Sequence, residues 1–237
     1  MLQGDYLSVL EAKDKAQFES VVIRFAQQLG FETVSAMVVV DRPGIESEFV
    51  TVHNTPMAFE QDFEAPSLGK RDPVMQHCRR QTMPIVWGQK TYLDQDAIEL
   101  WEIQAKYGYR NGIAMALHMP EGRHFMLGVD RGQALPTESH ELTRIVADLQ
   151  LFAVHAQDTA LRVLVSETLQ PERPSITPRE LEVLRWTMDG KTAWEAGVLL
   201  GVTERTVIQH LQNAMRKLEC NSKHQAVLKA LRLGLIH

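Results

Sequence analysis

Five side chains near the C-terminus recur at the spacing of one helix face, and their types suit contact with nucleic acid. Glutamine can make two hydrogen bonds to adenine, an aliphatic side chain can contact the thymine methyl group, and arginine can bind phosphate. The alternative is a helix that packs inside a four-helix unit and turns these side chains toward solvent. The five residues are Arg205, Ile208, Gln209, Gln212 and Arg216.

A carboxylate in the first half of the chain suits either a helix cap or a ligand acceptor. Asp72 precedes Pro73, and an aspartate cap followed by proline at the first helical position is a common helix start. If the carboxylate faced an apolar pocket it would need a hydrogen-bond donor, because an unpaired buried charge is costly. A ligand can supply that donor, so both roles remain open.

Catalytic and metal chemistry have little support in the residue pattern. His77 and Cys78 are neighbours, and neighbouring helical side chains diverge by ~100°, so they do not form a Cys–His pair. Three other histidines lack the spacing of metal ligands. We therefore expect no enzyme, no catalytic residue, no metal and no cofactor. These histidines are His53, His118 and His124.

The residues after 176 predict helices only. Thr177 to Glu180 form a helix start with Thr177 as the cap, and Gly190 ends that helix. Two helices joined by a short turn that contains glycine are typical of a helix-turn-helix, whose second helix enters the major groove. Thr203 would cap that second helix and direct its N-terminus toward a phosphate. The remaining predicted helices cover 191–200, 204–218 and 223–233.

The residues before 166 predict a mixture of helices and strands, which indicates a sheet with helices on both faces. An apolar stripe on the last long helix, within residues 142–160, serves either the core or a dimer interface, and we favour the interface. Trp87 and Trp101 suit core positions, and Trp87 equally suits a pocket wall. The elements expected are helices ending at Gly30, starting at Pro73, over 95–107 and from Thr137, and strands over 33–41, 49–53, 112–119 and 123–130.

The charge of the chain is divided unevenly along its 237 residues. The net charge of −5 argues against nucleic-acid binding. Residues 1–174 carry −8, however, and residues 175–237 carry +3, which favours contact between the tail and nucleic acid. A solvated basic helix face would look the same. We expect domains at 1–165 and 177–237 with a linker at 166–176.

Composition excludes several classes of protein. No apolar run approaches the ~20 residues of a membrane-spanning helix, and the first residues lack the pattern of a secretory signal. Cys78 and Cys220 are the two cysteines, too few for a disulfide framework and suited to a reducing compartment. A cytoplasmic protein without a membrane partner is expected.

The tail resembles the DNA-binding domain of the LuxR family of quorum-sensing regulators. The matching pattern is T-x-R-E-x-E-V-L, then G-K-T, then E-R-T-V-x-x-H-x-x-N-x-x-x-K-L, and Glu180, Leu184 and Gly190 match residues that the family shares. Ile208 stands where the family often has a lysine or arginine. The resemblance therefore implies base contacts through amide and methyl groups. The DNA-contacting residues it implies are Lys191, Thr203, Arg205, Thr206, Ile208, Gln209, Gln212, Arg216 and Lys217, with Lys223 as a further phosphate contact.

The first half resembles the autoinducer-binding domain of the same family more weakly. The Asp-Pro pair, Trp87 and Gly112 match shared residues, and the resemblance implies an α-β-α sandwich around an acyl-homoserine lactone, with Asp72 accepting from the ligand amide. Hydrogen-bonding residues of the family pocket are replaced, which implies a different or more apolar ligand. The replacements are Phe59 for Trp, Phe63 and Thr55 for Tyr, and Ala114 and Gly128 for hydroxyl-bearing residues.

Together these features predict an α+β protein. Its N-terminal α-β-α sandwich would bind a small-molecule signal, and its C-terminal four-helix domain would bind double-stranded DNA as a homodimer on a two-fold symmetric operator. Two alternatives remain. In the first, the chain is a regulator that binds DNA without a ligand. In the second, it is an enzyme that acts on a small molecule, although Asp72 has no visible catalytic partner.

Overall fold

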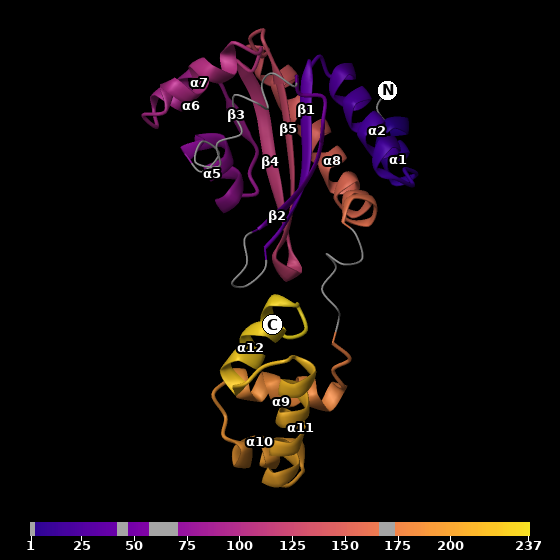
Figure 1. Cartoon of the computed structure of the whole chain (residues 1–237), viewed down its shortest axis with the longest axis vertical. Coiled ribbons are helices and arrows are strands. Elements are labelled where there is room, and N and C mark those ends of the chain that lie inside the picture. Colours follow the sequence, from indigo (N-terminus) through magenta and orange to yellow (C-terminus); the bar gives the residue numbers. More distant parts are fainter. Residues whose placement is uncertain (1–2, 42–46, 57–70, 166–173) are drawn as a thin grey trace. The chain divides into compact units, whose positions relative to one another are not determined.

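A computed structural model describes residues 3–41, 47–56, 71–165 and 174–237 of the chain. The chain divides into two compact units, whose boundary in sequence lies between residues 169 and 170. The first unit contains a sheet with helices on both faces, and the second contains helices only (Figure 1). This is the predicted combination of an α-β-α sandwich and a four-helix domain.

The sheet of the first unit has five strands in the order β2-β1-β5-β4-β3, and all neighbouring strands are antiparallel. Its central strands are rich in β-branched and apolar residues, which favour extended backbone. Side chains alternate between the two faces, so each strand contributes to two separate cores. The strands are β1 (Thr33–Val40), β2 (Glu48–His53), β3 (Ile85–Trp87), β4 (Asn111–Met119) and β5 (Arg123–Arg131).

One face of the sheet is covered by α1 (Gln3–Leu10), α2 (Lys15–Gln28) and the 26-residue α8 (Ser139–Leu164) (Figure 1). Phe25 of α2 stacks on Phe152 of α8 with ring centroids 4.0 Å apart, inside a continuous apolar core. The α8 stripe that we assigned to a dimer interface is part of this core. Its members Leu149, Phe152, Ala153, Ala156 and Ala160 are all buried against the sheet and α2.

The opposite face carries three short helices and a second, smaller core. Asp72 caps the first of them as predicted, with Pro73 at its first position. The helix expected over 95–107 is present over Ile98–Ala105, and Asp96, with a left-handed φ of 52°, separates it from a short helix over Gln89–Leu93 that was not predicted. Short elements at β3 and α1 were also not predicted. The helices on this face are α5 (Pro73–Arg80), α6 (Gln89–Leu93) and α7 (Ile98–Ala105).

The second unit contains the four helices that the sequence predicts. Thr177 caps α9 in a reciprocal capping box with Glu180, and Thr203 caps α11. Gly201, which ends α10, has a φ of 67° that only glycine adopts easily. Val207 and Ala214 of α11 are buried, as their spacing predicts. The helices are α9 (Pro178–Met188), α10 (Ala193–Leu200), α11 (Glu204–Lys217) and α12 (Lys223–Arg232).

Candidate functional site

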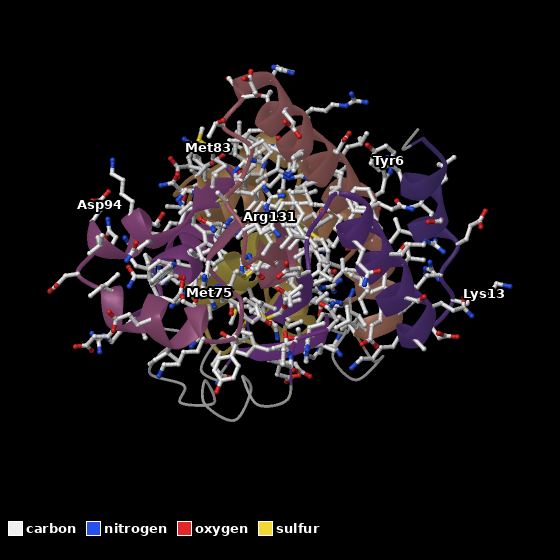
Figure 2. All side chains as sticks on the ribbon, turned by 90° about the horizontal axis from the view of Figure 1, so that it is seen from above. Tyr6, Lys13, Met75, Met83, Asp94 and Arg131 are labelled. Carbon is white, nitrogen blue, oxygen red and sulfur yellow. The ribbon has the colours of Figure 1, made fainter. Side chains whose placement is uncertain are left out.

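A cavity of about 180 Å³ lies between the sheet and the helices α5, α6 and α7. Met75 of α5 contributes to its wall, and Figure 2 shows Met75 on the opposite side of the sheet from Tyr6 of α1. Most of the wall is apolar, which suits an apolar ligand body, and a few polar groups interrupt it. The lining residues are Ser35, Met37, Asp72, Val74, Met75, Cys78, Trp87, Tyr92, Gln104, Tyr109, Ala114, Met115, Met126, Leu127, Gly128 and Asp130.

Asp72 is buried and all its acceptor sites are directed at donors of the protein itself. Its Oδ1 accepts from the backbone nitrogens of Val74 at 2.8 Å and Met75 at 3.0 Å. Its Oδ2 lies 2.8 Å from Gln104 Nε2 and 3.0 Å from the Tyr92 hydroxyl. The carboxylate therefore both caps α5 and joins α5 to α6 and α7.

The Tyr92 hydroxyl has two acceptors within reach but only one proton. Its oxygen lies 3.0 Å from Asp72 Oδ2 and 3.1 Å from Gln104 Oε1, so it donates to one of them at a time. When Tyr92 donates to Gln104, one acceptor site of Asp72 is open to another donor. In that arrangement Asp72 can accept a hydrogen bond from a ligand N–H or O–H.

Asp130 of β5 is a second buried acid, and its setting is the opposite of that of Asp72. Within the part of the chain that the structure describes, no donor reaches its carboxyl, which faces the cavity. Burial, and then the negative charge of Asp72, raise the pKa of Asp130 to about 8. At neutral pH the side chain is therefore mainly the uncharged acid, with one O–H donor and one carbonyl acceptor.

Gly112 of β4 is enclosed between Asp130 and Trp87. In the sheet its neighbours are Trp87 on β3 and Asp130 on β5. A Cβ at this position would lie 2.6 Å from Asp130 Oδ1, 2.7 Å from a Trp87 ring carbon and 2.5 Å from the Val129 carbonyl oxygen. The position thus requires glycine, because both side chains bend over its Cα atom.

Gly128 lies at the cavity floor in the next row of the sheet, between Ala114 and Ser35. A Cβ there would meet no atom within 4 Å, so glycine leaves open space at this point. Ser35 supplies a hydroxyl from the neighbouring strand, directly beside this space. The hydroxyl that β5 lacks at position 128 is therefore available from β1.

Cys78 also lines the cavity, but it is not a nucleophile. Burial, and then the charge of Asp72, raise the pKa of its thiol to about 12, so the thiolate is not formed at neutral pH. The neighbouring His77 is directed elsewhere, with Nε2 2.7 Å from the Met83 carbonyl oxygen. In the described residues no group of three or more His, Cys, Asp or Glu could hold a metal ion.

Five of the predicted DNA-contacting side chains of α11 share one exposed stripe. Val207, Ala214 and the partly buried Leu211 occupy the other side of the helix and pack in the core. Thr203 accepts from the backbone nitrogen of Thr206 at 3.2 Å, which fixes the start of the helix. The exposed side chains are Arg205, Ile208, Gln209, Gln212 and Arg216, and Lys191 before α10 is exposed as well.

Lys217 differs from these residues because its charge is used inside the domain. Its Nζ lies 2.8 Å from Oε2 of Glu180, which is buried at the start of α9. Burial alone would raise the pKa of Glu180, but hydrogen bonds from Lys217 and Thr177 outweigh it and hold that pKa below its ordinary value. The ion pair joins the start of α9 to the end of α11.

Comparison with known families decides what this combination is. An autoinducer binding domain matches residues 14–160, and a domain described as bacterial regulatory proteins, luxR family, matches residues 174–230. The chain belongs to the LuxR family. It is a ligand-responsive, DNA-binding transcription regulator of the quorum-sensing type, as the resemblance implied.

Relatives of this LuxR-family chain match it along its whole length. The transcriptional activator protein AnoR of Acinetobacter nosocomialis is 29% identical and SolR of Ralstonia solanacearum is 30% identical, each over 99% of this chain and 98% of the relative. A structure of SdiA in complex with octanoyl-rac-glycerol superimposes with a TM-score of 0.77 at 26% identity, covering 99% of this chain and 95% of that one. Escherichia coli SdiA gives 0.75 at 26% identity, covering 98% and 96%.

The ligand residues predicted from the LuxR resemblance are only partly brought together. Asp72, Trp87, Ala114 and Gly128 line the cavity, and Gly112 lies behind Trp87 and Asp130. Thr55 is not among the described lining residues, and Phe59 and Phe63 lie outside the described residues. Trp101 donates to the Arg110 carbonyl oxygen rather than lining the cavity.

Several lining residues of this LuxR-family pocket were not predicted. Met126 and Asp130 stand two residues before and two residues after Gly128, in the two-residue alternation of a strand, so that signal was present in the sequence. Tyr92 had no such signal, since α6 was not predicted, and Gln104 lies in the helix predicted over 95–107 but was not singled out as a lining residue. The described residues contain no helix that is long and apolar enough to cross a membrane.

Proposed function

We propose that the cavity binds a small amphiphile and that binding controls how a homodimer engages a two-fold symmetric operator. The cavity itself carries this proposal, since its wall is mainly apolar and is interrupted by a few polar groups. Asp72 would accept from a ligand donor when Tyr92 donates to Gln104 instead. A ligand that binds only the folded domain stabilises it by mass action.

The signal that fits this cavity is less polar than a standard short-chain acyl-homoserine lactone. Gly128 and Ala114 present no hydroxyl to the ligand, and Ser35 supplies one from a different strand. Trp87 and the Asp72 network also line the cavity and remain as polar partners. Loss of buried hydrogen-bond partners costs ~1–3 kcal/mol each, enough to change ligand preference.

Thermal unfolding of the full chain with a series of amphiphiles tests this function. We expect apolar-tailed amphiphiles to raise the unfolding temperature more than short-chain lactones. Mass spectrometry of molecules released from protein expressed in a lactone-producing host identifies what is bound. Full operator binding by protein that releases no molecule would instead support a ligand-independent regulator, and tight stabilisation by short-chain lactones would contradict the ligand preference.

For DNA, we propose that Ile208, Gln209 and Gln212 contact base edges while Arg205, Arg216, Lys191 and the helix start at Thr203 and Thr206 contact phosphates. The exposed stripe on α11 supports this division. Lys217 was expected to bind phosphate, but its ion pair with Glu180 leads us to propose a structural role instead. Half-sites ~10 bp apart, or a multiple of that distance, would match a dimer of such helices.

Two substitutions separate the proposed base and phosphate contacts. Gln212→Ala should change the preferred base at one operator position, because it removes a bidentate amide. Arg216→Ala should weaken binding to all sequences similarly and reduce its salt dependence, because it removes one phosphate contact. Binding titrations on a set of operator variants at two salt concentrations measure both effects. Equal losses on every sequence for both variants would contradict the division.

The dimer itself is proposed to form through the outward side of α8. Leu151 and Val154 are exposed there, 44% and 48% accessible, while the opposite side of the helix is in the core. Residues three apart on a helix are neighbours, so the two side chains form one apolar surface. Leu151→Glu should convert the dimer to monomer in light scattering, whereas Asp94→Asn, an exposed acid at the end of α6, serves as control. A dimer that persists in Leu151→Glu would exclude this surface.

A further inference from the structure

Among the described residues two acids line the cavity, and only for Asp130 do those residues place no donor on the carboxyl. Asp72 has four donors of the protein within hydrogen-bond distance. Asp130 is only 9% exposed, and the described residues place no donor on its carboxyl. A buried polar group without a partner is expensive, so a site that retains one commonly uses it.

The surroundings of Asp130 determine the form in which it meets a ligand. The titratable groups that face the cavity with it are Asp72 and Cys78 from the α5 segment, Tyr92 from α6 and Tyr109 after α7. None of these described groups is a cation, and Asp72 is an anion, so the surroundings favour the uncharged acid. An uncharged carboxyl can donate its proton to an acceptor, which a carboxylate cannot.

The open space next to Asp130 could hold the polar head group of a ligand. Gly128 lies two residues before Asp130 on the same face of β5, and its missing side chain leaves open space. Ser35 lies across from Gly128 on β1. A head group above Gly128 would therefore have the Asp130 carboxyl on one side and the Ser35 hydroxyl on the other.

We propose that Asp130 is a ligand-binding residue of this cavity, and that its uncharged carboxyl donates a hydrogen bond to a carbonyl oxygen of an amphiphile whose head group lies over Gly128. This inference rests on the proposed amphiphile-binding function and adds the chemical class of head group to it. It assigns a specificity-determining role to a residue that the sequence alone did not single out. Ligands with a carbonyl next to the apolar chain are selected over otherwise identical ligands without one.

A pair of probes that differ only in the carbonyl tests this directly on the full chain. 1-Octanoylglycerol has an ester carbonyl, and 1-O-octylglycerol has a CH₂ group in its place. Calorimetric titration of the wild type at pH 6 should show the ester bound roughly tenfold more tightly than the ether, the effect of about one buried hydrogen bond. Asp130→Leu should remove this preference by weakening the ester roughly tenfold and leaving the ether within about twofold.

A second variant keeps the test valid if Asp130→Leu does not fold. Asp130→Asn retains a donor and an acceptor but cannot ionise, so it should bind the ester within about threefold of wild type. Raising the pH from 6 to 9 ionises Asp130 in the wild type and should weaken ester binding by roughly tenfold, with no such change in Asp130→Asn. Asp94→Asn, an exposed acid at the end of α6, should behave as wild type throughout.

The outcomes separate this inference from the function on which it rests. If the wild type binds the ester and Asp130→Leu binds it equally well, or loses both probes equally, the inference is wrong and the amphiphile site stands. If Asp130→Asn keeps the pH dependence of the wild type, another group donates the proton and the inference is also wrong. If the folded wild type binds neither probe, the proposed amphiphile-binding function fails for this class and the inference fails with it.

Discussion

Each unit of this protein contains a buried acid, Glu180 in the DNA-binding unit and Asp130 in the ligand unit. The two acids differ in the donors that reach their carboxyl groups and in the direction in which their pKa is shifted. The Glu180 carboxylate in the DNA-binding unit accepts from Lys217 Nζ and from the backbone nitrogen of its capping residue Thr177, and its pKa is lowered. Asp130 in the ligand unit has no donor among the described residues, and its pKa is raised to about 8. A fully paired buried acid indicates a structural role, whereas an unpaired one facing a cavity indicates a partner from outside.

The same contrast holds inside the ligand unit, between Asp72 and Asp130. Asp72 is 4% exposed and joins three helices through its hydrogen bonds, so it holds the cavity wall together. Asp130 contributes no such connection. Burial alone therefore does not separate these two acids, whereas the number of donors that the described residues direct at each carboxyl does.

The largest expected loss of stability comes from a substitution at Gly112, which packs against Asp130. Gly112→Ala places a methyl group within 2.7 Å of three atoms, including Asp130 Oδ1. Overpacking of this kind costs about 3 kcal/mol, and we expect the free energy of unfolding in urea to fall by that amount. Gly128→Ala is the matched control, since its Cβ has no atom within 4 Å, and its stability should stay within about 0.5 kcal/mol of wild type. Equal losses of unfolding free energy in both variants would contradict the difference in packing between Gly112 and Gly128.

The next largest loss of stability is expected when Glu180 loses its partner Lys217. Lys217→Met leaves the buried Glu180 without its cation and should lower the stability of the DNA-binding unit by roughly 2 kcal/mol. The double variant with Glu180→Gln should recover part of that loss, because it removes the unpaired charge. Denaturant unfolding followed at Trp186, whose indole packs in this domain, reports the change. A Lys217→Met variant as stable as wild type would show that Lys217 is free for phosphate.

The pH dependence of stability should have opposite signs for the two acids. The pKa of Asp130 rises from 3.8 to about 8 on folding, so its contribution is complete at low pH and is lost as the pH rises through 8. The pKa of Glu180 is lowered on folding, so its contribution is present above its unfolded value and is lost as the pH falls below it.

Asp130→Asn isolates the first of these contributions. Relative to wild type, the variant should gain at least about 1 kcal/mol of stability between pH 5 and pH 8, because the amide does not ionise. Urea titrations at several pH values measure this difference. A constant difference between variant and wild type across this range would show that Asp130 is ionised in the folded protein.

The smallest expected loss of stability concerns the N-terminal cap of α11. Thr203→Ala removes the cap that accepts from Thr206 N and should cost about 1 kcal/mol, while Thr203→Ser should be near neutral. Thermal unfolding measures this loss. Operator binding by the folded Thr203→Ala variant should fall as well, since the start of α11 is proposed to meet a phosphate, and unchanged binding would contradict that contact.

The DNA-binding unit could be predicted from sequence nearly completely. Its helix starts carry local signals, such as the Thr177–Glu180 capping box and the glycine at 201, and its buried positions follow one helical period. These signals depend on residues a few positions apart, so no tertiary information is needed. The pairing of Lys217 with Glu180 was missed because it joins residues far apart in sequence.

The ligand site was predicted less well for the same reason. Asp72 carries a local signal as a helix cap, but its partner Tyr92 comes from a helix that was not predicted, and its hydrogen bond with Gln104 joins residues 32 positions apart. Ser35 lies opposite Gly128 because of strand register, which sequence spacing does not show. The apolar α8 stripe was assigned to a dimer interface, whereas its depth of burial comes from the sheet beneath it.

The two faces of the sheet also have a consequence for how such a protein changes over generations. The face under α2 and α8 is filled by a continuous core, while the opposite face encloses the cavity. Residues that face the cavity, such as Gly128 and Ser35, can be exchanged without disturbing the packed side. New signal preferences can therefore arise by drift on one surface of the sheet while the other preserves the fold that carries them.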